Sequence, residues 1–242
     1  MDRSSSKVCL FCGQQRPMSK EHVIPKWVLR ELDMEKTMLM AKHVNFTGQP
    51  HSERHHDFLS LVAGCVCEDC NCGWMSRLEA TIQPLLTPLF HARKASRAAQ
   101  EQLRLHRELI VRWALKTAAA LNYSSNYRKI VPLAHPHLLL NGGCPSFIFV
   151  RAGFVRGFGT KWYQSQQVIF ATKVGEQLPS DIYSFSFQLG HLCLNVAHIP
   201  GAIRRVGGRA HVQLAPNFKA RSSSACIYDD FEAFDVDGVF ET

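Results

Sequence analysis

Four cysteines in two closely spaced pairs give the clearest chemical signal in this chain. Cys9 and Cys12 form one CxxC pair, and Cys67 and Cys70 form a second after a spacer of 54 residues. A two-residue gap lets both thiolates of a pair bind one ion, and two such pairs supply the four ligands of a tetrahedral zinc site. The sequence therefore predicts one structural zinc ion held by four thiolates.

The other five cysteines leave some alternatives open. Cys65 and Cys72 each lie two residues from a member of the second pair, which would also allow other pairings. We favour Cys67 with Cys70 because their spacing matches that of the first pair. A CxxC pair can also be a redox pair, but two of them in one short region favour a metal. Three scattered cysteines are expected to be buried structural residues: Cys144, Cys193 and Cys226.

Three motifs surround these pairs: CLFCG at 9–13, SKEHVIPKW at 19–27 and CEDCNCGWMSRLE at 67–79. Together they resemble the HNH endonuclease superfamily, in its branch with two zinc-binding CxxC pairs, and the chain is similar to bacterial and phage members of it. The resemblance covers residues 7–79, about one third of the chain. It implies a zinc-stapled ββα-metal module, treble-clef-like around the zinc, in which a β-hairpin and a helix hold a catalytic cation.

The resemblance also implies roles for single residues. Glu21 matches the acidic ligand of the catalytic cation, His22 the general base that deprotonates the attacking water, and Asn71 the last ligand of the cation. Histidine suits that role because its pKa lies near neutrality. A divalent cation neutralises charge on the scissile phosphate and the leaving oxygen. A carboxylate suits Mg²⁺ or Mn²⁺ and four thiolates suit zinc, so the two metals would have different tasks.

One residue of the family pattern lacks a clear counterpart. Members usually carry an asparagine midway between the histidine and the second cysteine pair, and Asn45 is the one asparagine between residues 23 and 66. Asn45 is therefore either the residue that orients the histidine or an ordinary turn residue. Three histidines nearby could replace a missing ligand or could be solvated surface residues: His51, His55 and His56.

The middle of the chain is strongly basic. Residues 91–129 contain nine Lys or Arg against two Glu, and the last 17 residues carry six acidic residues and no basic one. Because the whole chain has a net charge of +8, the remainder without that tail carries +14. Such a surface attracts phosphate backbones, and we expect Arg104, Arg107 and Arg112 to contact double-stranded DNA. The alternatives are a helix face that is only solvated, and an acidic tail that occupies the basic surface.

Other enzyme classes are disfavoured. Lys116 and Thr117 lack the glycine-rich loop of a phosphate-binding motif, and neither G-x-S-x-G nor G-x-G-x-x-G occurs. A zinc deaminase needs H-x-E with a later P-C-x-x-C, whereas here Glu21 precedes His22 and no proline precedes either CxxC pair. The sequence thus predicts a metal-dependent endonuclease acting on nucleic acid, with a non-catalytic zinc module that binds DNA or protein as the alternative.

Three segments of an α+β protein would position these residues. Residues 1–79 would form the zinc module, residues 80–129 basic helices, and residues 130–242 an antiparallel β-rich region with an acidic tail, which could bind a protein partner. The chain is expected to be cytoplasmic, because its first residues have no apolar core of a signal peptide and reduced thiolates suit a cytoplasmic zinc site. No membrane partner is expected.

Periodicity predicts the individual elements. The helix that begins near Asn71 is expected to end by Gln83, because Pro84 and Pro88 follow. Its first apolar residues are predicted to pack inward and not to stack on bases: Trp74, Met75 and Leu78. Helical spacing predicts a second buried face: Leu103, Ile110, Trp113, Ala114, Thr117, Ala118 and Leu121.

The β-rich region is predicted from alternating residues. Apolar and small polar residues alternate within the uncharged run at 182–203, which predicts paired strands and argues against a membrane helix. The candidate strands are 147–150, 167–171, 183–189, 192–197 and 211–214.

Overall fold

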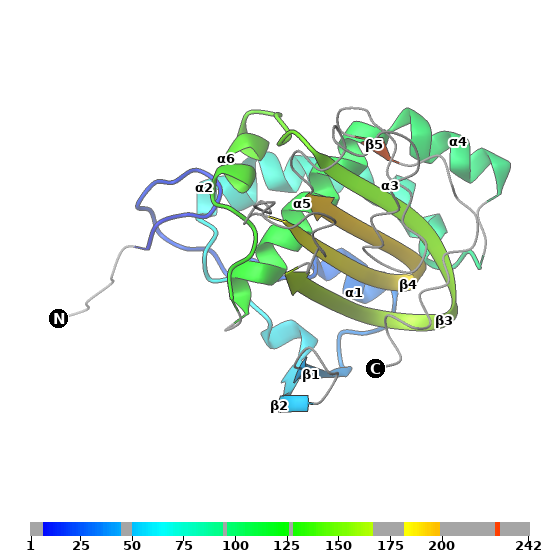
Figure 1. Ribbon diagram of the computed structural model, residues 1–242, viewed down its shortest axis with the longest axis horizontal. Coiled ribbons are helices and arrows are strands. Elements are labelled where there is room, and N and C mark those ends of the chain that lie inside the picture. The colour runs from blue at the N-terminus through cyan, green and yellow to red at the C-terminus, as the bar shows by residue number, and fades with distance from the viewer. Residues whose placement is uncertain are drawn as a thin grey trace, which may run out of the picture.

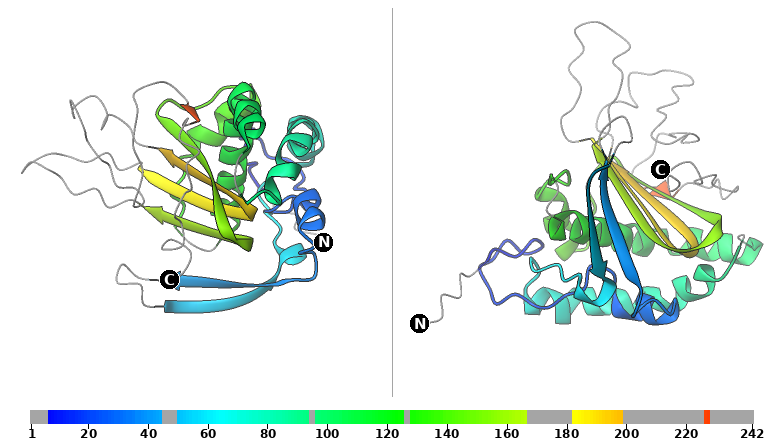
Figure 2. Two further views of the ribbon diagram at one scale, coloured as in Figure 1. Left: turned by 90° about the vertical axis from the view of Figure 1, so that its right-hand side faces the viewer. Right: turned by 90° about the horizontal axis from the view of Figure 1, so that it is seen from below.

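The computed structural model describes residues 7–44, 50–93, 96–125, 128–166, 182–198 and 226–227. Outside these residues lie Asn45, the predicted strands at 167–171 and 211–214, and the acidic tail beyond residue 227. The described part is a mixed α+β fold, as predicted, with two small β-sheets (Figure 1). Helices lie on one face of the larger sheet, and a two-stranded hairpin projects beside it (Figure 2).

The N-terminal region has little regular secondary structure, and isolated β-bridges hold its backbone in place. Three isolated antiparallel bridges join Val8 to Gln15, Met18 to Cys67 and His22 to Val62. Helix α1 (Lys26–Glu31) follows, and then the hairpin of β1 (Met38–Val44) and β2 (Pro50–Asp57). A single 3₁₀ turn, η1 (Phe58–Ser60), leads back towards the second cysteine pair.

The second cysteine pair opens a long helical segment made of α2 (Glu68–Cys70), the π-turn η2 (Asn71–Met75) and α3 (Ser76–Phe90). The expectation that this helix ends by Gln83 is wrong, because α3 continues through Pro84 and Pro88 to Phe90. Both prolines are exposed, so the lost backbone hydrogen bonds face water while the opposite face is held by burial. That face is apolar and almost fully buried: Leu78, Ile82, Leu86, Leu89 and Phe90.

The basic helical segment contains α4 (Arg97–Leu105) and α5 (Arg107–Ser124), separated by a break at His106, and α6 (Ala134–Leu140) follows. Every residue of the predicted buried face is at most 2% exposed, so that prediction is confirmed. Trp74, Met75 and Leu78 are also buried, as expected of packing residues. Among the described helices, none combines the length and the apolar character needed to cross a bilayer.

The larger sheet contains β3 (Ile148–Gln166), β4 (Tyr183–His198) and β5 (Cys226–Ile227). β3 pairs with β4 antiparallel and with β5 in parallel. The predicted strands at 183–189 and 192–197 are not two paired strands but one strand of 16 residues, β4. All 16 residues are buried, so the alternation did not mark one solvent-facing side.

At Gly190, β4 packs closely against the end of α3. Its φ of +65° lies in the left-handed region that favours glycine. A Cβ atom at this position would lie 2.2 Å from the carbonyl oxygen of Phe90, the last residue of α3. The absence of a side chain therefore allows the sheet and α3 to approach one another.

Candidate metal centre and the adjoining polar site

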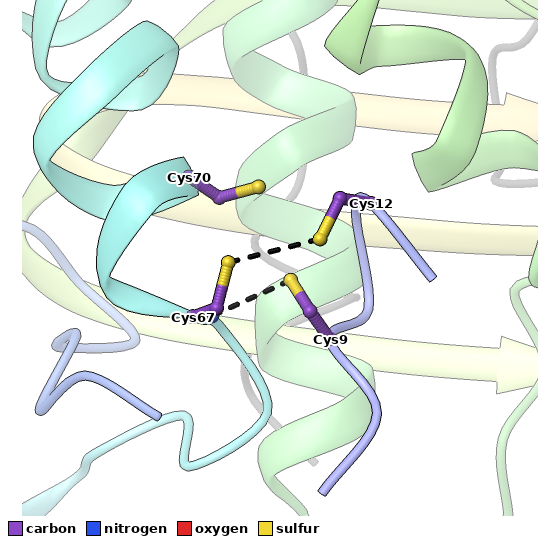
Figure 3. Close-up of side chains that lie close together, drawn as sticks. All are labelled: Cys9, Cys12, Cys67 and Cys70. Atoms are coloured by element: carbon purple, nitrogen blue, oxygen red, sulfur yellow. Dashed lines mark hydrogen bonds between the residues drawn. The ribbon is translucent and has the colours of Figure 1, made fainter. Parts of the chain in front are cut away.

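The four cysteines of the two CxxC pairs converge, two from the N-terminal loop and two from the start of the helical segment (Figure 3). Their Sγ atoms all lie within 4.8 Å of one another, and those of Cys12 and Cys67 are 3.7 Å apart. A tetrahedral zinc with Zn–S bonds of about 2.3 Å places its sulfurs about 3.8 Å apart. The cluster can therefore bind a metal ion such as zinc with small adjustments of the side chains.

Local backbone geometry builds this cluster. The first pair lies in a tight turn, in which Gly13 donates to the carbonyl of Cys9 and has a φ of +67°. The second pair lies around a helix start, where the N–H of Asn71 donates to the carbonyl of Cys67. The N–H of Cys67 also donates to Cys9 Sγ at 3.4 Å (Figure 3). The two pairs are thus held together by the protein itself.

The cluster favours ionised sulfur at one position and resists it at others. Burial alone would raise the pKa of Cys9, but backbone N–H donors more than offset this and lower the pKa to about 7. Burial raises the pKa of Cys12 and of Cys70, and the neighbouring sulfurs add to that effect. Four adjacent thiolates therefore require a cation to remain ionised together.

The remaining described cysteines do not belong to the cluster. Cys65 is half-buried and Cys72 is exposed. Burial raises the pKa of the Cys65 thiol to about 11. In the described ranges, the quartet is the one group in which three or more His, Cys, Asp or Glu side chains bring ligand atoms together. The structure therefore confirms that Cys67 and Cys70, and neither Cys65 nor Cys72, join Cys9 and Cys12 in the cluster.

Glu21 and His22 lie on a short extended segment paired with residues 61–63. Val23 donates to the carbonyl of Leu61 at 2.9 Å, and Ala63 donates to the carbonyl of Glu21 at 2.7 Å. Successive side chains of an extended segment point to opposite faces. Glu21 accordingly contacts the interior, where it meets Lys116, while His22 lies near Lys26.

The Glu21 carboxylate belongs to a cluster of polar side chains that also contains Lys116 and Glu79. The Asn71 side chain lies close enough to the Glu21 carboxylate to lower its pKa, which brings together two of the residues singled out in the sequence. Lys116, whose side chain is fully buried, places Nζ 3.4 Å from Glu21 Oε1 and 2.5 Å from Glu79 Oε1. Burial raises the pKa of Glu21. Burial lowers the pKa of Lys116, but the carboxylates of Glu79 and then Glu21 outweigh it, so its pKa is raised overall.

His22 carries an unusual ring nitrogen. Its Nδ1 is buried and has no hydrogen-bond partner among the described residues. Burial lowers the pKa of His22, and the neighbouring charge of Lys26 lowers it further. The ring is therefore neutral at neutral pH, which is the form that accepts a proton.

The other sequence candidates lie elsewhere. Asn45 and the side chain of His51 are outside the described residues. His55 is exposed and His56 half-buried, both on β2 of the projecting hairpin, and neither belongs to a metal-type group within the described part of the chain.

The three arginines expected to contact DNA have different surroundings. Arg104 on α4 and Arg107 at the start of α5 are exposed. Arg112 is half-buried: its Nη2 donates to the carbonyl of Leu139 at 2.9 Å, and its guanidinium lies 6.0 Å from the ring centre of Trp74. Arg112 therefore joins α5 to α6, and a role in DNA binding stays a prediction for all three.

Sequence reasoning missed the two charged partners of Glu21. In the sequence, Lys116 is noticed only because Lys116 and Thr117 form part of an incomplete phosphate-binding pattern. Glu79 is noticed only as the last residue of the third motif. A further signal is present, because Lys116 stands among Ala114, Leu115 and Ala118 on a helix that is otherwise apolar there. A lysine in such a position must be paired with a buried acid.

Comparison with protein-family models, curated proteins and solved structures finds no match for this chain.

Proposed function

We propose that this protein is a metal-dependent endonuclease of the HNH type that hydrolyses phosphodiester bonds of nucleic acid, with double-stranded DNA as substrate. The proximity of the Asn71 side chain to the Glu21 carboxylate supports this proposal. These residues are far apart in the sequence, one on an extended segment before the hairpin and the other at a helix start directly after a cysteine pair. They occupy the two positions at which the HNH resemblance places ligands of one cation.

The proposal needs two metals. Four thiolates fill a tetrahedral zinc site and leave no position for water, so zinc would staple a ββα-metal, treble-clef-like module. A second cation, Mg²⁺ or Mn²⁺, would be held by the oxygens of Glu21 and Asn71, which are hard ligands suited to it. When bound, that cation supplies charge neutralisation at the phosphate. The charge of the site also suits a cation, because the side chains of Glu21, Glu79 and Lys116 together carry a net charge of −1.

His22 would take the proton from the attacking water. It precedes Val23 on the same extended segment as Glu21, and its unpartnered Nδ1 has no competing hydrogen bond in the described structure. The pairing with Val62 fixes the backbone on which the imidazole stands. The main chain thus fixes the imidazole one residue from Glu21, on the other face of the extended segment.

His22→Ala is expected to abolish cleavage of plasmid DNA in Mg²⁺, Mn²⁺ or Ni²⁺, by about 10²-fold or more, because a general base contributes about that factor. Zinc content, thermal unfolding and DNA affinity should remain nearly unchanged. His55→Ala, an exposed histidine on β2, is the matched control and should cleave normally. Equal cleavage by wild type and His22→Ala would refute the assignment of the base.

One observation favours a second candidate, a non-catalytic zinc module that binds DNA or a protein. The Glu21 carboxylate already has a cationic partner, because Lys116 Nζ lies 3.4 Å away. In this case no divalent cation would support cleavage by the wild type, while binding would persist. The plasmid assay therefore separates the two candidates. A protein partner of the C-terminal region stays a prediction.

Arg104→Gln with Arg107→Gln is expected to weaken binding to duplex DNA and to flatten its dependence on salt. For each phosphate that the variant no longer neutralises, the slope of log K against log salt should fall by about 0.9. Both residues are exposed, so folding should not change. The matched control is Arg30→Gln with Lys36→Gln, two exposed positions in and near α1 that remove the same charge. An equal weakening in both variants would mean that only the overall charge matters.

A further inference from the structure

We propose that the buried Lys116 and the partly buried Glu79 form a charge-balancing pair that keeps the Glu21 carboxylate available to a divalent cation. This inference rests on the proposed function, because that function assigns the cation to Glu21. Neither Glu79 nor Lys116 would touch the cation or the substrate, so both are positioning residues.

The distances show how Lys116 divides its charge. Its ammonium nitrogen is 2.5 Å from Glu79 Oε1, which is the length of a strong charge-assisted hydrogen bond. The same nitrogen is 3.4 Å from Glu21 Oε1, at the outer limit of a hydrogen bond. Because the Lys116 side chain is fully buried, protein groups and not bulk water must neutralise it. Glu79 is its main partner, and Glu21 is the weaker one.

Glu79 is held firmly in this role. The indole Nε1 of Trp113 donates to Oε1 at 3.1 Å, and the indole Nε1 of Trp27 donates to Oε2. The Trp27 ring also stacks on Phe90 with ring centres 5.7 Å apart. Both oxygens of Glu79 therefore have donors, and the aromatic rings prevent the carboxylate from turning towards another partner.

The charge count gives the functional consequence. With Glu79 ionised, the two carboxylates and one ammonium sum to −1 at Glu21, where Asn71 adds an uncharged ligand. Without the charge of Glu79, Lys116 and Glu21 would cancel each other. A divalent cation would then enter a neutral, buried site, which costs desolvation free energy without a compensating attraction. Glu79 would thus set cation affinity through Lys116.

The test is Mn²⁺ binding by the full-length zinc-loaded protein, followed by the electron paramagnetic resonance signal of free Mn²⁺. Glu79→Gln should raise the Kd by about tenfold or more, since one charge is lost beside a divalent ion. Glu79→Gln combined with Lys116→Met restores the net charge of −1 and should return the Kd to within about threefold of wild type, because charge and not shape sets the affinity. Glu21→Gln should remove the site.

Two further variants separate charge from packing. Lys116→Met alone should bind Mn²⁺ at least as tightly as wild type, whereas a purely structural lysine predicts weaker binding. Trp27→Phe removes one hydrogen bond from Glu79 without changing charge, so its Mn²⁺ affinity should remain close to that of wild type. Thermal unfolding and zinc content of each variant report the fold.

The outcomes distinguish the two proposals. If Glu21→Gln and wild type bind Mn²⁺ equally, the cation site of the proposed function is wrong, and this inference is overturned with it. If wild type has a Glu21-dependent site but the double variant binds as weakly as Glu79→Gln, only the charge-balancing role is overturned.

Discussion

Replacing any one of the four clustered cysteines by serine is expected to release zinc and unfold the N-terminal region. Structural zinc contributes roughly 10–16 kcal/mol at neutral pH, which is as large as the whole stability of a typical domain, about 5–15 kcal/mol. The first pair also holds Leu10 and Phe11 in the core, where Phe11 packs edge-on against Trp74 with ring centres 5.3 Å apart. Loss of the ion therefore removes both a cross-link and a set of apolar contacts.

Elemental analysis and thermal unfolding would measure this effect. Wild type should contain one zinc per chain and should unfold on prolonged treatment with a strong chelator. Cys72→Ser is the matched control, because Cys72 is exposed and lies two residues from Cys70. It should keep its zinc and its unfolding temperature. Folded wild-type protein without zinc would contradict the assignment.

Gly190→Ala is expected to destabilise the protein by more than about 4 kcal/mol, which places it among the most severe single substitutions. The added Cβ would lie 2.2 Å from the carbonyl oxygen and 2.9 Å from the carbonyl carbon of Phe90. These are backbone atoms of α3, so the clash can be relieved only by moving the helix away from β4. The positive φ adds about 1–2 kcal/mol for any residue with a side chain.

Urea unfolding of the two alanine variants would test this. Gly159 pairs directly with Gly190 across the sheet, and a Cβ at Gly159 would meet nothing within 4 Å. Gly159→Ala should therefore change the free energy of unfolding by less than about 1 kcal/mol, as expected of a substitution without a clash. Similar destabilisation in both variants would mean that the contact with Phe90 does not limit this position.

The parts of the fold that follow from local sequence could be predicted. The spacing of Cys67 and Cys70 selected, among the described cysteines, the two that join Cys9 and Cys12 in one cluster. The helical period of α5 identified residues that are fully buried, such as Trp113. Both signals depend on neighbours in sequence, because ligand spacing and helix periodicity are properties of a short segment.

Other features depend on contacts between distant segments and were missed for that reason. The local rule that proline ends a helix failed at Pro84, because burial of the opposite face of α3 outweighs the missing hydrogen bonds. The alternation in β4 predicted two paired strands, yet these residues form one strand that is buried along its whole length. Lys116 and Arg112 are simply two basic residues in the sequence, but their roles depend on Glu79 and on the carbonyl of Leu139.

The β1–β2 hairpin is joined to the rest of the protein at its base. Met38 and Asp57 pair at its base, so the chain leaves and returns at points only about 5 Å apart. The segments that carry Glu21 and the second cysteine pair are fixed separately, by the pairing of His22 with Val62 and of Met18 with Cys67. We therefore expect that a hairpin of another length or composition could replace residues 38–57 without moving the segments that carry Glu21 and the second cysteine pair.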